Sequence, residues 1–177
     1  MSKKLIRKEL LHTRLNLLPE FTNSTRIIVV KNLTNLCKSG IDKIGSYSPI
    51  YNEIDIGALE SELSHINYYF PKVFDETNRS LHWGPRPLVS GFRGILEPIK
   101  CSGYESLDLL IVPCIGFSDY GYRLGYGGGF YDSYLKHEKK KPITVGVAYE
   151  FSRTEFEPEA HDHKLDVLIT ELGTTFF

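Results

Sequence analysis

The feature that limits the possible folds most is an apolar segment that leads directly into a glycine-rich one. Residues 107–117, LDLLIVPCIGF, are almost continuously apolar, which is typical of a strand buried on both faces of a sheet. Glycine then occupies four of the five positions from 125 to 129, and a helical pattern follows at 130–140. A buried strand, a glycine loop and a helix in this order predict an α/β fold with a ligand at the carboxyl end of the strand.

The rest of the chain alternates in the same way. Helices are predicted at residues 2–18, 23–40 and 53–65, with Asn23 or Ser24 as the cap of the second and Gly40 past its end. Strands are predicted at 42–49, 66–73, 142–150 and 164–172. Residues 74–106 are rich in Pro, Gly and Ser and predict short strands, hairpins and irregular loops. We therefore expect one α/β domain, residues 1–177, with a three-layer α/β/α architecture in which the middle layer is a mostly parallel (mixed) sheet.

Composition excludes several classes of function. The formal net charge of −1 gives no electrostatic argument for nucleic acid or for an anionic membrane surface. The first residues lack the apolar core of a secretory signal, and no apolar run approaches the ~18 residues that span a bilayer. Three scattered cysteines without a CxxC spacing argue against a disulfide framework or a zinc knuckle. We expect a cytoplasmic protein that binds neither nucleic acid nor membrane.

The glycine loop has the chemistry of a phosphate site. Glycines let backbone N–H groups approach a phosphate, and the start of the following helix adds partial positive charge. Arg123 precedes the glycines, and Asp132 follows them in the first turn of the predicted helix, where it could cap the helix or hold a metal ion. The loop has neither the GK[ST] ending of a P-loop nor the GxGxxG spacing of dinucleotide sites. A tight connection without a ligand is the alternative reading.

The segment DLLIVPCIGFSDYGYRLGYGGGFYDSYL closely resembles the signature of the 5-formyltetrahydrofolate cyclo-ligase family, roughly P-x-x-x-F-D-x-x-G-x-R-L-G-x-G-x-G-Y-Y-D. The residues in step with that pattern are Pro113, Phe117, Gly121, Arg123, Leu124, Gly125, Gly127, Gly129, Tyr131 and Asp132. KKLIRKELLHTR, YSPIYNEIDIGAL, GILEP and HDHKLDVLITE extend the resemblance over nearly the whole chain, with residues 74–92 least alike.

The resemblance implies an enzyme that uses ATP and Mg²⁺ to convert 5-formyltetrahydrofolate to 5,10-methenyltetrahydrofolate, with ADP and phosphate as products. Its partners would be these small molecules, ATP and a reduced folate, and we expect a monomer. The reaction needs positioning and charge stabilisation rather than an enzyme nucleophile. That fits a sequence without an evident Ser-His-Asp or Cys-His constellation.

The resemblance also implies the ATP-binding residues. Lys3 and Arg7 lie on one face of the predicted first helix together with Arg14, since they are spaced four and seven. Arg123 and Asp132 are the expected catalytic residues. For Lys4 and Lys8 a solvated charged face is the simpler reading. The ATP-binding set is Lys3, Lys4, Arg7, Arg123, Leu124, Gly125, Tyr126, Gly127, Gly128, Gly129, Phe130 and Tyr131.

The resemblance also implies metal and folate contacts. Asp132 and Asp162 match the metal-contacting positions and offer the hard oxygen ligands that Mg²⁺ takes, although Asp162 could also be a plain turn residue. His161 and His163 flank Asp162, but no third nitrogen or sulfur ligand is near enough in sequence to favour zinc. Trp83 and Tyr149 are candidates to stack on the pterin. The expected substrate-binding residues are Ser48, Glu53, Tyr126, Gly127, Gly128, Gly129 and Phe130.

The chain departs from the family pattern at three places, and two alternatives to the enzyme are kept. Ser118 stands where the family usually has Asp, a common Gln is replaced near Phe151 or Ser152, and the usual proline is displaced to Pro158. One alternative is an ATP- or folate-binding homologue with little or no cyclo-ligase activity. Another, on fold-level analogy alone, is a relative of sugar-phosphate isomerases or CoA-transferases.

Overall fold

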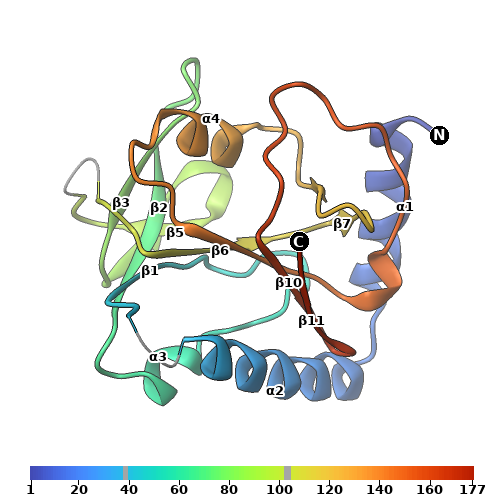
Figure 1. Cartoon of the computed structure of the whole chain (residues 1–177), viewed down its shortest axis with the longest axis horizontal. Helices are drawn as coiled ribbons and strands as arrows, with labels where there is room; N and C mark the ends of the chain where they lie inside the picture. Colours follow the sequence, from blue (N-terminus) through green and yellow to red (C-terminus); the bar gives the residue numbers. More distant parts are fainter. Residues whose placement is uncertain (38–39, 102–104) are drawn as a thin grey trace.

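The computed structural model describes residues 1–37, 40–101 and 105–177, and a single seven-stranded sheet organises it (Figure 1). The strand order is β11-β10-β9-β6-β1-β2-β3. The five inner strands run parallel, and the edge strands β11 and β3 pair antiparallel. The bounds are β1 Lys43–Gly45, β2 Asn67–Asp75, β3 Ser80–Gly84, β6 Leu109–Pro113, β9 Ile143–Val147, β10 Val167–Thr170 and β11 Gly173–Phe176. The prediction of a mostly parallel, mixed sheet is confirmed.

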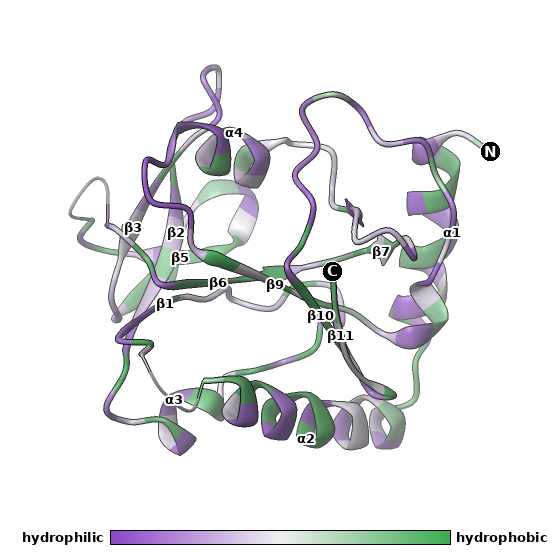
Figure 2. Cartoon of the chain, in the orientation of Figure 1, coloured by the Kyte–Doolittle hydropathy of each residue, from purple (hydrophilic) through white to green (hydrophobic). Residues whose placement is uncertain are grey.

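Helices cover both faces of this sheet (Figure 1). Successive side chains of β6 point to opposite faces, so Leu109 and Ile111 pack with α2 (Pro19–Leu36), and Leu110 and Val112 pack with α4 (Phe130–His137). Figure 2 shows the resulting hydrophobic band along the central strands. The prediction that the apolar run of residues 107–117 contains a strand buried on both faces of the sheet is therefore confirmed.

The first helix, α1 (Lys3–Leu15), has a different place, because it lies across the carboxyl ends of the strands. The Arg14 guanidinium reaches the Cys114 carbonyl, just past the end of β6, with an N–O distance of 3.4 Å. Leu10 packs on Gly116, where a Cβ would come within 2.7 Å of the leucine Cδ1. Gly116 therefore lets α1 approach the backbone that follows β6, and α1 brings its basic residues to the edge of the sheet where ligands bind in α/β folds.

The sheet topology also marks that edge as the ligand-binding one. From β1 the chain continues to β2 on one side, whereas β6 is added on the other side. The loops that follow β1 and β6 therefore leave the sheet in opposite directions and open a crevice between them, which is the usual ligand position in open α/β sheets. The loop after β6 is the glycine-rich one, and the loop after β1 contains Ser48 and Glu53.

Two helix predictions were wrong in their bounds. The second helix begins at Pro19 with Leu18 as its N-cap, rather than at Asn23 or Ser24, because proline is well suited to the first turn of a helix. The helix predicted at 53–65 is reduced to α3 (Leu59–Glu62), since residues 53–56 form an irregular segment that buries Ile54 and Ile56 in the core. The predicted end of the second helix at 38–39 lies outside the described residues.

The Pro-, Gly- and Ser-rich segment does form hairpins, as predicted. Strands β2 and β3 form one hairpin, β4 (Leu88–Ser90) and β5 (Leu96–Pro98) form another, and a 3₁₀ turn, η1 (Phe92–Gly94), lies between β4 and β5. Residues 102–104 of this segment lie outside the described ranges. The antiparallel edge strand β11 was not predicted. None of the described helices has the length and hydropathy needed to cross a bilayer.

Candidate active site at the glycine-rich loop

The glycine-rich segment begins with a small hairpin of β7 (Gly116–Phe117) and β8 (Arg123–Leu124). Ser118 is buried in its turn, where the N–H of Tyr122 donates to the Ser118 hydroxyl over 3.3 Å and the N–H of Ser118 donates to the Tyr122 carbonyl. An aspartate would offer its carboxylate oxygen at the same place. The substitution at this position is therefore compatible with the turn, which needs an acceptor rather than a charge.

Glycine is suited to the next positions of the loop for different structural reasons. Gly127 and Gly129 have φ of 88° and 69°, in the left-handed region that disfavours side chains. A Cβ at Gly125 would meet nothing within 4 Å, so the backbone there borders open space. Gly129 is the N-cap of α4, and the first turn of that helix carries Asp132. The loop thus exposes backbone at the start of a helix, as its composition suggests for a phosphate site.

A cavity of about 320 Å³ lies over this loop and is formed by four separate segments. These are α1, the tip of the β2–β3 hairpin, the stretch from the end of β6 through the glycine loop to the first turn of α4, and the chain around residue 160, which arches between α1 and α4 (Figure 1). The lining residues are Lys3, Arg7, Arg79, Val112, Pro113, Arg123, Gly125, Tyr126, Gly127, Gly129, Phe130, Tyr131, Asp132, Glu159, His161 and Asp162. Cations and carboxylates therefore face one another across a single hollow.

Arg123 and Asp132 form the inner charge pair of the cavity. The Arg123 Nη2 donates to Asp132 Oδ1 over 2.6 Å, and its Nη1 donates to the His163 carbonyl over 2.9 Å. The same Asp132 oxygen accepts the N–H of His163. The carboxylate is thus turned toward β8 and the loop after residue 160, so the pair with Arg123, not helix capping, fixes its position. Burial and the nearby Lys141 keep the pKa of His163 below its usual value.

Lys3 and Asp162 form the outer pair. The Lys3 ammonium donates to Asp162 Oδ2 over 2.8 Å and to Glu159 over 3.0 Å. Burial alone would lower the pKa of Lys3, but hydrogen bonds to the two carboxylates outweigh it and raise that pKa. Burial would likewise raise the pKa of Asp162, but the Glu159 N–H and the Lys3 ammonium lower it in sum. Asp162 therefore closes a local turn and also holds α1 in place.

Asp132 and Asp162 are the residues that could hold a metal ion. Both line the cavity, and each has one carboxylate oxygen engaged by a cation. Within the described ranges, no three His, Cys, Asp or Glu side chains are grouped as a metal site. The donor set fits Mg²⁺, which takes one or two carboxylates and completes its shell with water and phosphate oxygens.

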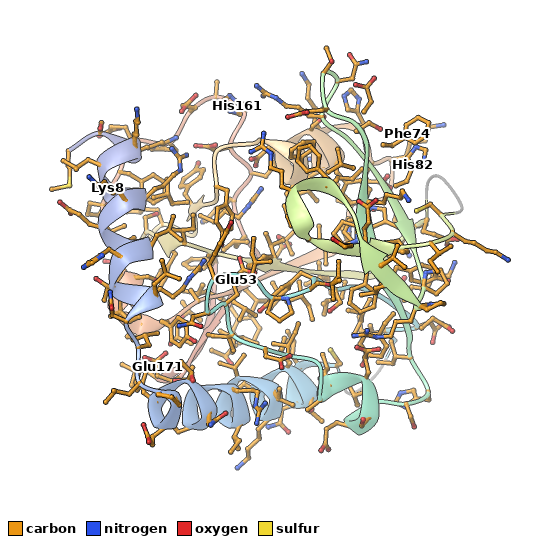
Figure 3. The ribbon with its side chains drawn as sticks, turned by 180° about the vertical axis from the view of Figure 1, so that it is seen from behind. Lys8, Glu53, Phe74, His82, His161 and Glu171 are labelled. Atoms are coloured by element: carbon orange, nitrogen blue, oxygen red, sulfur yellow. The ribbon has the colours of Figure 1, made fainter. Side chains whose placement is uncertain are left out.

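A second charge cluster lies behind the loop and is buried. The Arg14 Nη2 donates to the Tyr126 hydroxyl, and that hydroxyl donates to Glu53 Oε1 over 3.1 Å. The other Glu53 oxygen accepts the N–H of Ile50, and the Arg14 Nε donates to the Tyr51 carbonyl. Figure 3 shows Glu53 in the interior, between α1 and the sheet. Burial raises the pKa of Glu53, although Ile50, Arg14 and Tyr126 oppose the shift.

The structure brings most of the predicted site residues to the cavity, but not all. Lys4 is exposed on the outer side of α1, Leu124 is buried in the core, and neither Gly128 nor Glu53 lines the cavity. Ser48 lies in the loop after β1, and its hydroxyl oxygen is buried without a hydrogen-bond partner among the described residues. An unsatisfied hydroxyl in this loop is the kind of group that a polar substrate atom can satisfy.

The two aromatic candidates for stacking on a pterin are excluded by burial. Trp83 is fully buried and packs edge-on against Tyr134 in the core under α4. Tyr149 is buried on the other face of the sheet, stacked on Phe21 and Phe151. Phe130 at the start of α4 does line the cavity, with the ring of Phe92 edge-on to it.

The predicted site residues did not include three ionisable residues of the cavity wall, Arg79, Glu159 and His161. The sequence suggested His161 only as a possible zinc ligand, and Figure 3 shows it in the segment between α1 and α4. Glu159 could have been found from its spacing of three to Asp162, since the two close one turn. Arg79 has no local signal, because only the packing of the β2–β3 hairpin brings it to the glycine loop.

Comparison with known proteins gives a consistent result. The sequence matches the 5-formyltetrahydrofolate cyclo-ligase family over residues 1–171. A 5-formyltetrahydrofolate cyclo-ligase from Mycoplasma pneumoniae is 29% identical over 176 residues, covering 97% of this chain and 99% of that protein. The fold is similar to that of a 5,10-methenyltetrahydrofolate synthetase from Mycoplasma pneumoniae, with a TM-score of 0.83, 26% identity and coverage of 97% and 99%. For the synthetase from Aquifex aeolicus the TM-score is 0.85, with 33% identity and coverage of 99% and 93%.

Proposed function

Because the chain belongs to the 5-formyltetrahydrofolate cyclo-ligase family of ligases, we propose that it converts 5-formyltetrahydrofolate to 5,10-methenyltetrahydrofolate using ATP and Mg²⁺. ADP and phosphate are the other products. The observation that carries this proposal is the cavity over the glycine loop, which gathers Lys3, Arg7, Arg123, Asp132 and Asp162 from distant parts of the chain.

The proposed reaction proceeds in two steps. The formyl oxygen on N5 attacks the γ-phosphorus of ATP, the bond to the bridging oxygen of ADP breaks, and the formyl carbon becomes electrophilic. N10 of the same folate then attacks that carbon and loses its proton, and the N5 lone pair expels phosphate to leave the 5,10-methenyl cation. No bond to the protein forms, so the chain has to position two substrates and stabilise charge.

Cationic side chains are proposed to bind the triphosphate. Arg123 is buried beside the glycines and is held by Asp132, so its guanidinium is already oriented before a phosphate arrives. Arg7 donates its Nε to the Gly125 carbonyl over 2.7 Å, and its remaining N–H groups are available for a second partner. Lys3 completes the set at the rim of the cavity. We assign no role to Lys4, because it faces away from the cavity.

Asp132 and Asp162 are proposed to hold Mg²⁺ through the carboxylate oxygens that Arg123 and Lys3 leave available. A bound Mg²⁺ would supply positive charge that offsets the charge of the triphosphate. The protein's own contribution is to hold two carboxylates at the wall of the cavity that also carries the cations.

The folate is proposed to lie on the other side of the loop, toward the loop after β1. Glu53 and Ser48 come from that loop, and Tyr126 lines the cavity while its hydroxyl contacts Glu53. The raised pKa of Glu53 and the unpartnered Ser48 hydroxyl suit contact with polar edges of a pterin. Phe130 supplies an aromatic surface at the start of α4.

Turnover distinguishes this proposal from a binding homologue without activity. The purified chain is mixed with 5-formyltetrahydrofolate, ATP and Mg²⁺, and the methenyl absorbance in the near ultraviolet is followed. We expect a rise that needs all three components and matches the ADP released. A chain that binds ATP and folate in calorimetry without this rise would support the binding homologue instead.

The assembly and location are proposed on simpler grounds. We propose a monomer that acts on ATP and a reduced folate, and the proposed phosphate and metal contacts Lys3, Arg7, Arg123, Asp132 and Asp162 meet within one chain. We also propose a cytoplasmic location, which agrees with the free thiols of Cys37, Cys101 and Cys114.

A further inference from the structure

Arg79 brings a positive charge to the cavity from a part of the chain that no motif connects to it. It lies at the tip of the β2–β3 hairpin, directly before β3, with a left-handed φ of 53°. Its side chain lines the same cavity as Lys3, Arg7 and Arg123. The hairpin therefore supplies a fourth cation, opposite to those that α1 supplies.

The other three cations of the cavity already have oxygen partners. Lys3 binds the carboxylates of Asp162 and Glu159, Arg7 binds the Gly125 carbonyl, and Arg123 binds Asp132. The guanidinium of Arg79 makes no side-chain hydrogen bond or ion pair with any described residue. All five of its N–H donors are therefore available to an anion.

The acidic residues of the hairpin do not account for Arg79, because each has another partner. Asp75 accepts the N–H groups of Thr77 and Asn78 and the Asn78 side-chain amide. Glu76 pairs with Arg93, with an N–O distance of 3.0 Å. Both carboxylates of the hairpin therefore have other partners, and the Arg79 guanidinium faces the cavity.

The contact of Arg79 with the glycine loop shows where that guanidinium lies. A Cβ on Gly129 would come within 3.0 Å of Arg79 Nη1, and a Cβ on Gly127 would lie 3.5 Å from Arg7 Cζ. Two arginines from different elements therefore lie against the two left-handed glycines of one loop. The arginine at Gly129 is also next to the start of α4, where backbone N–H groups lack helical partners.

We propose that Arg79 is a further phosphate-binding residue, which contacts the triphosphate from the hairpin side while Arg7 contacts it from α1. This rests on the proposed function. The fork of N–H groups on a guanidinium matches the oxygens of a phosphoryl group, and such contacts are strong because both partners are charged. A phosphate is preferred to a folate carboxylate because Arg79 shares its cavity wall with the glycines and with the carboxylates proposed to hold Mg²⁺.

The test compares Arg79→Asn with Arg93→Asn in the intact chain. Arg93 is a matched control: it also has a left-handed φ, of 54°, and contacts the same hairpin through Glu76, but it does not line the cavity. Asparagine tolerates the left-handed region, so both variants lose a charge without added backbone strain. Calorimetry measures the Kd of ATP, ADP, adenosine and 5-formyltetrahydrofolate, with Mg²⁺ present for the nucleotides.

We expect Arg79→Asn to weaken ATP binding about tenfold, which corresponds to the loss of one charge-assisted contact, and to leave adenosine and folate binding unchanged. Arg93→Asn should change ATP binding less than twofold. Arg79→Lys should recover part of the loss, since it restores the charge but not the fork. An ATP affinity as in the control would overturn the proposal, and so would a loss confined to the folate or shared with adenosine. A wild-type chain that binds no ATP would overturn the proposed function as well.

Discussion

The charged pairs on the cavity side of the glycine loop are partly exposed, whereas those on its buried side are not. On the cavity side the side chains of Lys3 and Asp162 are 17% and 15% exposed, and each pair there leaves oxygens or N–H groups available. On the buried side the side chains of Arg14 and Glu53 are both 4% exposed, with Tyr126 between them. The first arrangement can exchange partners when a ligand arrives. The second has no solvent to replace a lost partner, so losing a partner there without a ligand in its place destabilises the loop.

The comparison predicts that the largest loss of stability comes from the buried side. Arg14→Met should lower the free energy of unfolding by about 3–5 kcal/mol, because it leaves the Glu53 carboxylate buried beside an uncharged neighbour. Urea unfolding followed by circular dichroism measures this. Arg153→Met is the control, since Arg153 and its partner Asp119 are exposed, and exposed pairs contribute at most about 1 kcal/mol. Equal losses in the two variants would show that burial adds nothing to the cost of removing the partner of Glu53.

On the cavity side the expected loss is in activity rather than in stability. Asp132→Asn should reduce turnover about 100-fold, roughly 2.7 kcal/mol in the barrier, and raise the Mg²⁺ concentration needed. The fold should be retained, because the amide oxygen can still accept the hydrogen bonds of Arg123 and His163.

Asp119→Asn is the matched control for that variant. It removes a carboxylate from the same glycine-rich segment, but Asp119 pairs with Arg153 at the surface and does not line the cavity. Steady-state rates over a Mg²⁺ series measure both variants. Full activity of Asp132→Asn at limiting Mg²⁺ would contradict the metal assignment.

The smallest effect expected is a pH dependence that comes from Glu53. Burial raises the pKa of Glu53 above the value near 4.5 of a free side chain, so the unfolded chain releases this proton first as the pH rises. The wild type should therefore lose stability relative to Glu53→Gln from pH 4.5 upward, until the pH passes the raised pKa. Urea unfolding of both proteins over a pH series measures this, and a wild type that keeps or gains stability relative to Glu53→Gln over that range would contradict the burial of this carboxyl.

The sequence predicted those elements whose structure is determined by residues close together in the chain. The strand at β6, the glycine loop and α4 follow one another in the chain, and each is specified by its own residues. The hydrophobic pattern wrongly predicted a helix at residues 53–56. Ile54 and Ile56 are buried in the core, but they lie in an irregular segment and not on a helix face. Pro19 determined the start of α2 against the polar caps downstream. Arg79 and the Arg14–Tyr126–Glu53 cluster depend on contacts between distant elements, for which one sequence contains no local signal.

The contact between Lys3 and Asp162 has a consequence for how the protein matures. It joins residues 159 positions apart, and the Arg14 contact to the backbone after β6 joins residues 100 positions apart. Contacts of such long range close large loops and form late in folding. Helix α1 is synthesised well before Asp162. Until Asp162 is made, Lys3 lacks this carboxylate partner, so a nascent or truncated chain can contain β1 to β9 and still lack one wall of the proposed active site.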